Sequence, residues 1–301
     1  MKILLFGANG QVGFELKKSL STLGQVVALG REQADLNKLD HLQETIRNVS
    51  PNVIVNAAAY TAVDKAEDNI SAVHKINADA VKIMALEAKR LNAWLIHYST
   101  DYVFNGLQSS PYIETAETKP INVYGWTKLQ GEEFVKQTDC LHLILRTSWV
   151  YSLRQNNFAK TILRLANDKE EINIVDDQIG VPTSAEFIAE TTSHCLNQLL
   201  QQEAHNSKAS GIYHLTPNGR TSWYDFACFL IQEAEQLDLS LKLKSANIHP
   251  IPSTEYPTPA KRPSYSLLDN SKIQKVFDLE FPDWTHHAKK FIFNFKQLET
   301  A

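Results

Sequence analysis

The chain has 301 residues, with 30 basic and 34 acidic residues and a net charge of −4. Apolar residues make up 43% of it, which is enough for a folded core. We expect no nucleic-acid partner, because positive charge is not clustered, and no membrane partner, because the opening apolar run is too short to span a bilayer. Cys140, Cys195 and Cys228 form no CxxC motif, so we expect no disulfide framework and a reducing, cytoplasmic location.

Apolar runs alternate with helical patterns through the first half of the chain. Continuous apolar runs are typical of a parallel sheet that is covered on both faces. Their alternation with helices predicts right-handed βαβ units in an α/β, Rossmann-type doubly wound parallel sheet. The predicted strands are residues 2–6, 25–29, 53–55, 93–97 and 141–145, and the predicted helices are 11–23, 38–49, 70–91 and 122–137.

The second half is less regular and has a proline-rich stretch between Pro250 and Pro263. This pattern predicts a smaller, loop-rich C-terminal domain packed against the sheet, and the chain could cross back to the first domain. Helices are predicted at residues 184–201, 222–236 and 283–297, and short apolar segments lie at 172–175 and 211–215.

A glycine turn, Gly7-Ala8-Asn9-Gly10-Gln11-Val12-Gly13, joins the first strand to the first helix. Glycine is needed where the backbone turns tightly and where a pyrophosphate must approach it closely. The helix that follows offers free N–H groups and a positive dipole end, with Gln11 and Val12 in its first turn. This position predicts a dinucleotide site, and a glycine-lined turn without a ligand is the alternative.

Arg31 follows the second strand, where an acidic residue would hold the ribose hydroxyl of NAD. An arginine favours the 2′-phosphate of NADP, so we expect NADPH, with NADH or a merely solvated Arg31 as alternatives. Asp35 and Leu36 lie where the adenine could rest. We therefore predict an NADP-binding Rossmann domain over residues 1–149 and a mainly substrate-binding domain over 150–301.

Tyr124 is the only tyrosine with a lysine, Lys128, four residues further on. Residues four apart share one face of a helix, so both side chains can reach one cleft. A neighbouring ammonium is expected to lower the phenol pKa from its usual value of about 10, which helps proton transfer. Ser99-Thr100-Asp101 follows the fourth predicted strand and places hydroxyls where they could polarise a carbonyl or, alternatively, only satisfy loop backbone groups.

Longer strings of the chain resemble the dTDP-4-dehydrorhamnose reductase family of the extended short-chain dehydrogenase/reductase superfamily. They cover most of the sequence and include its irregular second half. The strings are LLFGANGQVG, VIVNAAAYTAVDKAE, IHYSTDYVFNG, YGWTKLQGE, RTSWVY, NNFAKTILRLA, DQIGVPTSAE and YPTPAKRP.

The resemblance implies roles for individual residues. Tyr124 is the proton donor, Lys128 lowers its pKa and holds the nicotinamide ribose, and Thr100 tunes the site. The substrate residues implied are Thr100, Asp101, Trp149, which could instead be a core residue, and Arg262, which could instead form a surface salt bridge. The implied cofactor residues are Gly7, Gly10, Gln11, Val12, Gly13, Arg31, Asp35, Leu36, Ala57, Ala58, Ala59, Tyr60, Thr61, Tyr98, Tyr124 and Lys128.

Some members of the family are dimers joined through magnesium held by carboxylates. Glu15 and Glu186 match two of those positions, whereas the third falls near Asn294. An amide cannot replace a carboxylate's charge at a magnesium site, so we assume no metal requirement and expect a monomer or a homodimer.

The implied activity is the reduction of dTDP-4-dehydro-β-L-rhamnose to dTDP-L-rhamnose by hydride transfer from NAD(P)H. This sugar nucleotide serves lipopolysaccharide or cell-wall polysaccharide synthesis. Two alternatives stay open: another sugar-nucleotide reductase or an epimerase, and a non-catalytic NADP-binding regulatory subunit of the methionine adenosyltransferase type. An epimerase would consume no net NADPH, and the intact Tyr124 and Lys128 pair argues against the regulatory subunit.

Overall fold

The computed structural model describes residues 1–201 and 206–299. At its centre is a sheet of six parallel strands in the order β10-β5-β4-β3-β1-β2. Because β1 pairs with β2 on one side and β3 on the other, the strand order reverses at β1, which is where open α/β sheets bind ligands. The strands are β1 (Lys2–Phe6), β2 (Gln25–Leu29), β3 (Val53–Asn56), β4 (Trp94–Thr100), β5 (His142–Thr147) and β10 (Gly211–His214).

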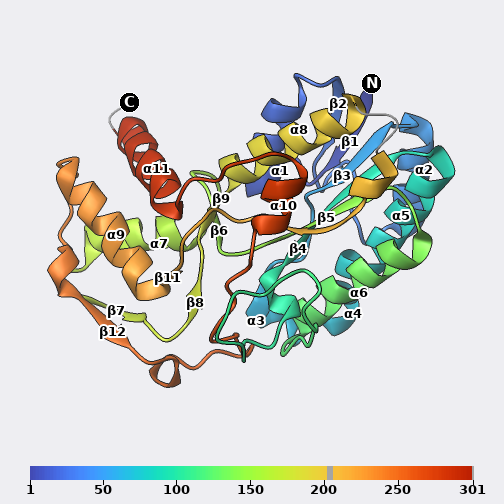
Figure 1. The fold of residues 1–301 in the computed structure, drawn as a ribbon. Helices are drawn as coiled ribbons and strands as arrows, with labels where there is room; N and C mark the ends of the chain where they lie inside the picture. The colour runs from blue at the N-terminus through green and yellow to red at the C-terminus, as the bar shows by residue number, and fades with distance from the viewer. Residues whose placement is uncertain (202–205, 300–301) are drawn as a thin grey trace.

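Helices cover both faces of this sheet (Figure 1). Side chains of a strand alternate between the faces, so Ile3 and Leu5 pack in one core while Leu4 and Phe6 pack in another. These two cores confirm the Rossmann-type doubly wound α/β sheet. The first core includes α1 (Gln11–Leu20) and α8 (Ala185–Gln201), and the second includes α2 (Leu39–Val49), α5 (Ala80–Leu91) and α6 (Val123–Thr138).

The segment 70–91 is not the single regular helix that the sequence predicts. It is α4 (Ile70–His74), a π-helical turn (Lys75–Asp79) and then α5. Within the turn, the Asn77 side chain accepts a hydrogen bond from the Tyr60 N–H at 2.8 Å and donates to the Tyr60 carbonyl at 3.2 Å. A π-turn widens a helix by one residue and is frequent at functional sites. Here it turns Asn77 inward to hold the segment after β3.

The second half of the chain forms its own core. α7 (Phe158–Asp168), α9 (Trp223–Gln236) and α11 (Trp284–Glu299) pack there with two paired parallel strands, β7 (Ile172–Val175) and β12 (Ile248–Ile251). The helices predicted at 222–236 and 283–297 are confirmed, whereas α7 was not predicted. Between these elements the chain returns to the first core, because α8 packs on α1 and β10 extends the sheet beside β5.

The other α-helices and strands are short. None of the helices in the described ranges combines the length and the apolar composition that a membrane crossing needs. The remaining elements are α3 (Val63–Ala66), β6 (Val150–Tyr151), β8 (Ile179–Gly180), β9 (Thr183–Ser184), β11 (Thr221–Ser222) and α10 (Ser271–Val276).

Candidate active site

A cleft of about 700 Å³ opens at the carboxyl ends of the central strands and extends to the second core. Most residues singled out from the sequence line it, whereas Gly13, Arg262, Glu15 and Glu186 do not. The predicted residues in its lining are Gly7, Gly10, Gln11, Val12, Arg31, Asp35, Leu36, Ala57, Ala58, Ala59, Tyr60, Thr61, Tyr98, Thr100, Asp101, Tyr124, Lys128 and Trp149.

The glycine turn leaves no room for side chains. Gly7 has a φ of +78°, and a Cβ on it would lie 2.7 Å from the backbone of Ala57 and Ala58. A Cβ on Gly13 would overlap the carbonyl oxygen of Gly7, so Gly13 permits the close packing of α1 against β1 rather than lining the cleft. The bare backbone beside the N-terminus of α1 fits the pyrophosphate of a dinucleotide.

A segment from the second half closes over this turn, which the sequence did not indicate. The Gln155 side chain donates to the Asn9 carbonyl at 2.6 Å. The Gln11 side-chain oxygen accepts from the Ser152 hydroxyl at 3.0 Å and from the Asn157 amide at 2.9 Å. Since these partners lie more than a hundred residues apart in the chain, no local pattern could have revealed them.

Lys128 is 2% exposed and projects from α6 into the cleft. Its ammonium donates to the Tyr98 carbonyl at 2.5 Å and lies 3.4 Å from His97 Nε2. Burial lowers the pKa of Lys128 to about 8, and the Glu132 carboxylate acts in the opposite direction. Tyr98 therefore serves the site through its backbone, because its hydroxyl is 2.7 Å from Thr192 on α8.

The sequence analysis did not single out His97, which lies beside Lys128. Its tautomer follows from the hydrogen bonds around it. Asn56 accepts from the Ala58 N–H through its side-chain oxygen at 3.1 Å, so its amide nitrogen faces His97 Nδ1 at 3.1 Å. Nδ1 is thus the acceptor, and a neutral ring carries its proton on Nε2, toward Lys128. Burial and the Lys128 charge hold the His97 pKa well below its usual value, so the ring is neutral.

Tyr124 lies in the first turn of α6 and lines the cleft. The Asn122 side chain caps this turn by accepting a hydrogen bond from the Gly125 N–H at 2.7 Å. Burial raises the pKa of Tyr124 to about 12, against an opposing hydrogen bond with Thr100. The predicted lowering of this pKa by Lys128 is therefore wrong for this geometry, because the ammonium donates to the Tyr98 carbonyl. A phenol with this pKa stays protonated at neutral pH, as a proton donor must.

Ser99 and Thr100 lie within β4, because this strand runs three residues beyond its predicted end. The Thr100 hydroxyl donates to Asp101 Oδ1 at 2.9 Å and accepts from the Tyr102 N–H at 3.1 Å. Asp101 is 2% exposed, and burial raises its pKa to about 6 against the hydrogen bond from Thr100. The strand thus delivers a hydroxyl and a carboxyl to the cleft beside Tyr124.

Asp101→Asn should remove a pH-dependent loss of stability. A carboxyl with a pKa of about 6 in the fold, against an ordinary value of 3.8, holds its proton more tightly when folded. Its stabilisation is therefore complete below about pH 4 and is lost as the pH rises through about 6, at a cost of roughly 3 kcal/mol. Urea unfolding at about pH 4 and about pH 8 measures this loss, and an equal pH dependence in both proteins would contradict it.

Trp149 stacks on Trp223, at the start of α9, with 3.6 Å between ring centroids and an interplanar angle of 11°. Both indoles line the cleft, and Trp149 has a φ of +46°, a conformation that a bulky residue rarely adopts. A Cβ on Gly180 would lie 2.7 Å from the Trp149 ring. Trp149 is therefore a wall of the cleft held by the second half, and its partner Trp223 was not predicted.

Arg262 already has a carboxylate partner. Its guanidinium donates to both side-chain oxygens of Asp64, at 2.8 and 3.2 Å, and to the Ala260 carbonyl at 3.1 Å. The structure thus shows the ion pair that was the alternative to phosphate binding, and a phosphate contact would require this pair to open.

The carboxylates of Glu15 and Glu186 do not fit a magnesium site. The Lys290 ammonium donates to Glu186 at 2.8 Å, and Asn294 supplies no charge. The described residues contain no cluster of three or more metal-binding side chains. We derive no step through a metal.

Comparisons with known proteins agree with this geometry. The family model described as "RmlD substrate binding domain" matches residues 1–297. The dTDP-4-dehydrorhamnose reductase of Burkholderia thailandensis is 46% identical over 95% of this chain and 96% of that protein, and its Escherichia coli K12 counterpart is 45% identical over 97% of each. The crystal structure of dTDP-4-dehydrorhamnose reductase from Bacillus anthracis in complex with NADP is 32% identical, with a TM-score of 0.86 over 97% of this chain and 99% of that one. The chain belongs to the dTDP-4-dehydrorhamnose reductase family.

Proposed function

We propose that this protein reduces dTDP-4-dehydro-β-L-rhamnose to dTDP-L-rhamnose with NADPH. The observation that carries the proposal is the placing of Tyr124, Thr100 and Lys128 in one cleft with the glycine turn. The relatives named above bear the same activity in their names.

The cofactor half of the cleft is formed by the first domain. Gly7 and Gly10 leave space for the pyrophosphate, and the amides of Gln11 and Val12 face it from α1. Arg31, Asp35 and Leu36 would hold the adenosine, and the segment 57–61 would line the rest of the dinucleotide. When bound, the nicotinamide supplies the hydride for the C4 carbonyl.

Residues of the protein supply the proton that the reduction needs. The Tyr124 phenol donates its proton to the oxygen that becomes the alcohol, and the neighbouring Thr100 hydroxyl opposes the rise in the phenol pKa that burial causes. Lys128 holds the nicotinamide ribose, and the Tyr98 carbonyl fixes the direction of its ammonium. Asp101 and Trp149 contact the sugar nucleotide. The ion pair between Arg262 and Asp64 argues against a phosphate contact by Arg262.

A spectrophotometric assay tests the activity. Purified protein, dTDP-4-dehydrorhamnose and NADPH should show loss of the reduced-nicotinamide absorbance in step with formation of dTDP-L-rhamnose. Conversion of the sugar without net NADPH oxidation would identify an epimerase. No conversion, together with copurification of a methionine adenosyltransferase, would favour the regulatory-subunit alternative.

Arg31 should set the preference for NADPH over NADH. It is exposed at the cleft, where a guanidinium can pair with a 2′-phosphate that NADH lacks. Arg31→Ala should raise the KM for NADPH about tenfold, which corresponds to about 1.4 kcal/mol, and leave the KM for NADH unchanged. Steady-state kinetics with both cofactors decides this, and equal changes for both would refute a phosphate contact.

We infer that residues 1–149 supply the cofactor half and that most of 150–301 supplies the substrate half, with 185–214 returning to the sheet. The free thiols of Cys140, Cys195 and Cys228 support a reducing, cytoplasmic compartment.

A further inference from the structure

We propose that Glu132 is a positioning residue for the reductase site: its buried pair with Arg146 fixes the catalytic face of α6 against β5 and against the loop that follows β4. The inference rests on the proposed function, because it assigns Glu132 a role toward Lys128.

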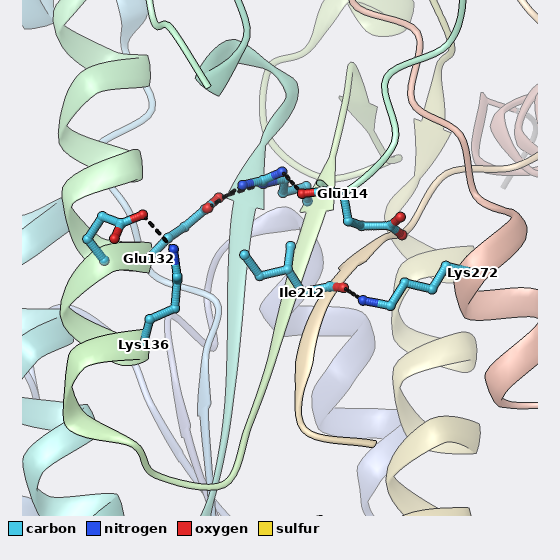
Figure 2. Close-up of polar contacts among 7 residues, drawn as sticks. Glu114, Glu132, Lys136, Ile212 and Lys272 are labelled. Carbon is cyan, nitrogen blue, oxygen red and sulfur yellow. Dashed lines mark hydrogen bonds and ion pairs between the residues drawn. The ribbon is translucent and has the colours of Figure 1, made fainter. Parts of the chain in front are cut away.

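The pair is bidentate and sealed from solvent. Arg146 donates to the two carboxylate oxygens of Glu132 at 2.9 and 2.6 Å, with Arg146 2% and Glu132 0% exposed. Figure 2 shows Glu132 directed from α6 toward the strands. On the same helix, Glu133 and Lys136 form an ion pair at 2.9 Å whose side chains are 37% and 48% exposed. One helix thus carries a buried pair and a surface pair side by side in the chain.

Glu132 shares a helix face with the catalytic residues. It lies four residues after Lys128 and eight after Tyr124, and residues at this spacing stack along one face. Its charge acts on Lys128 directly, since the carboxylate favours the ammonium against burial. The adjacent Gly131 lets α6 approach the π-turn so closely that a Cβ there would overlap the Asn77 carbonyl. Small rotations of α6 would therefore move both catalytic side chains.

Arg146 connects the face of α6 that carries Glu132 to the loop that follows β4. In the sheet it lies opposite Ser99 on β4 and His214 on β10. Its guanidinium carbon is 5.1 Å from the centre of the Phe104 ring, and its Nη1 donates to the Glu114 carbonyl at 3.4 Å. Figure 2 shows Glu114 on the side of the pair opposite α6. The pair thus joins the helix that carries Lys128 to the loop that begins at Asp101.

Stability alone does not require this arrangement. Apolar residues of similar volume often replace a buried ion pair with no loss of stability, whereas removing one partner is strongly destabilising. The double variant Glu132→Leu/Arg146→Met therefore separates folding from positioning. Glu132→Gln removes the charge with little change of shape, and Glu133→Gln, which breaks the surface pair, is the matched control.

Each variant is compared with wild type in thermal unfolding, NADPH affinity, and the pH dependence of kcat. We expect Glu132→Gln and the double variant to lower kcat about 10- to 100-fold, with the KM for NADPH changed far less. Loss of the carboxylate should also move the alkaline limb of kcat to lower pH by about one unit, because the Lys128 ammonium loses its favourable charge. Glu133→Gln should match wild type in all three measurements.

A double variant that folds and keeps the wild-type kcat and alkaline limb would overturn the proposal. So would a fall in kcat that follows only a fall in unfolding temperature, with the alkaline limb unmoved in both variants. Titration of the Lys128 side chain by carbon-13 NMR, assigned with Lys128→Met, gives a readout that does not depend on turnover. If wild type fails to oxidise NADPH with the sugar, the proposed function fails, and this titration still decides the effect of Glu132.

Discussion

Tyr124→Phe should lower kcat for reduction of the 4-dehydro sugar by about 10²–10⁴-fold, the usual contribution of a positioned general acid. The phenol lies half-buried in the cleft, and its pKa of about 12 keeps it protonated at neutral pH. Phenylalanine keeps the ring, which meets Tyr102 edge-on at 5.8 Å, so the pocket should keep its shape. NADPH affinity, measured by fluorescence titration, should therefore stay within about twofold of wild type.

The matched control is Tyr213→Phe. It makes the same chemical change on β10, where the hydroxyl donates to the Ala209 carbonyl at 2.8 Å and lies outside the cleft. Its turnover should equal that of wild type. Near-normal turnover in Tyr124→Phe would remove the tyrosine from the mechanism, and a parallel loss of NADPH binding would mean that the pocket had collapsed.

Gly13→Ala should have the largest effect on the fold and on cofactor binding together. The added methyl group would overlap the carbonyl oxygen of Gly7 and lie 3.1 Å from the Ala8 Cα, all of it backbone that cannot rotate away. The helix propensity gained by alanine, about 1 kcal/mol, does not offset this overlap. We expect a loss of about 3 kcal/mol in the free energy of unfolding and a rise of about 100-fold in the Kd of NADPH.

Gly211→Ala is the control for this change. A Cβ at Gly211 meets no atom closer than 3.9 Å, so the substitution should leave both the unfolding midpoint and the Kd close to wild type. Denaturant unfolding and cofactor titration of the two variants measure the contrast. Wild-type affinity for NADPH in Gly13→Ala would show that α1 does not need to pack so closely on β1.

The sheet could be predicted from the sequence because its strands are local apolar runs. The same logic missed features that long-range contacts decide. The ends of α2 and α5 are not among them, because the predicted ends at residues 49 and 91 are confirmed, although Ser50 and Asn92 stand in the left-handed region where glycine is common. The π-turn depends on Asn77 bonding to Tyr60, seventeen residues earlier, which no hydrophobic period reports.

The residues of the site also fall into those that the sequence could predict and those that it could not. The glycine turn and the Tyr124 and Lys128 pair were predictable, because their chemistry follows from spacing along one element. Trp223 was not predictable, since its meaning appears only when it stacks on Trp149 from the other half of the chain. The direction of the shift in the Tyr124 pKa was also predicted wrongly. Spacing along a helix indicates which side chains are near each other, but it does not indicate which acceptor receives the hydrogen bond of the Lys128 ammonium.

The stacked indoles give the cleft an optical signal of its own. At a centroid separation of 3.6 Å, Trp149 and Trp223 behave as one coupled chromophore, and one indole belongs to each half of the protein. A ligand that moves either indole should change the near-ultraviolet circular dichroism of the pair. The protein therefore reports occupancy of its cleft without any attached label.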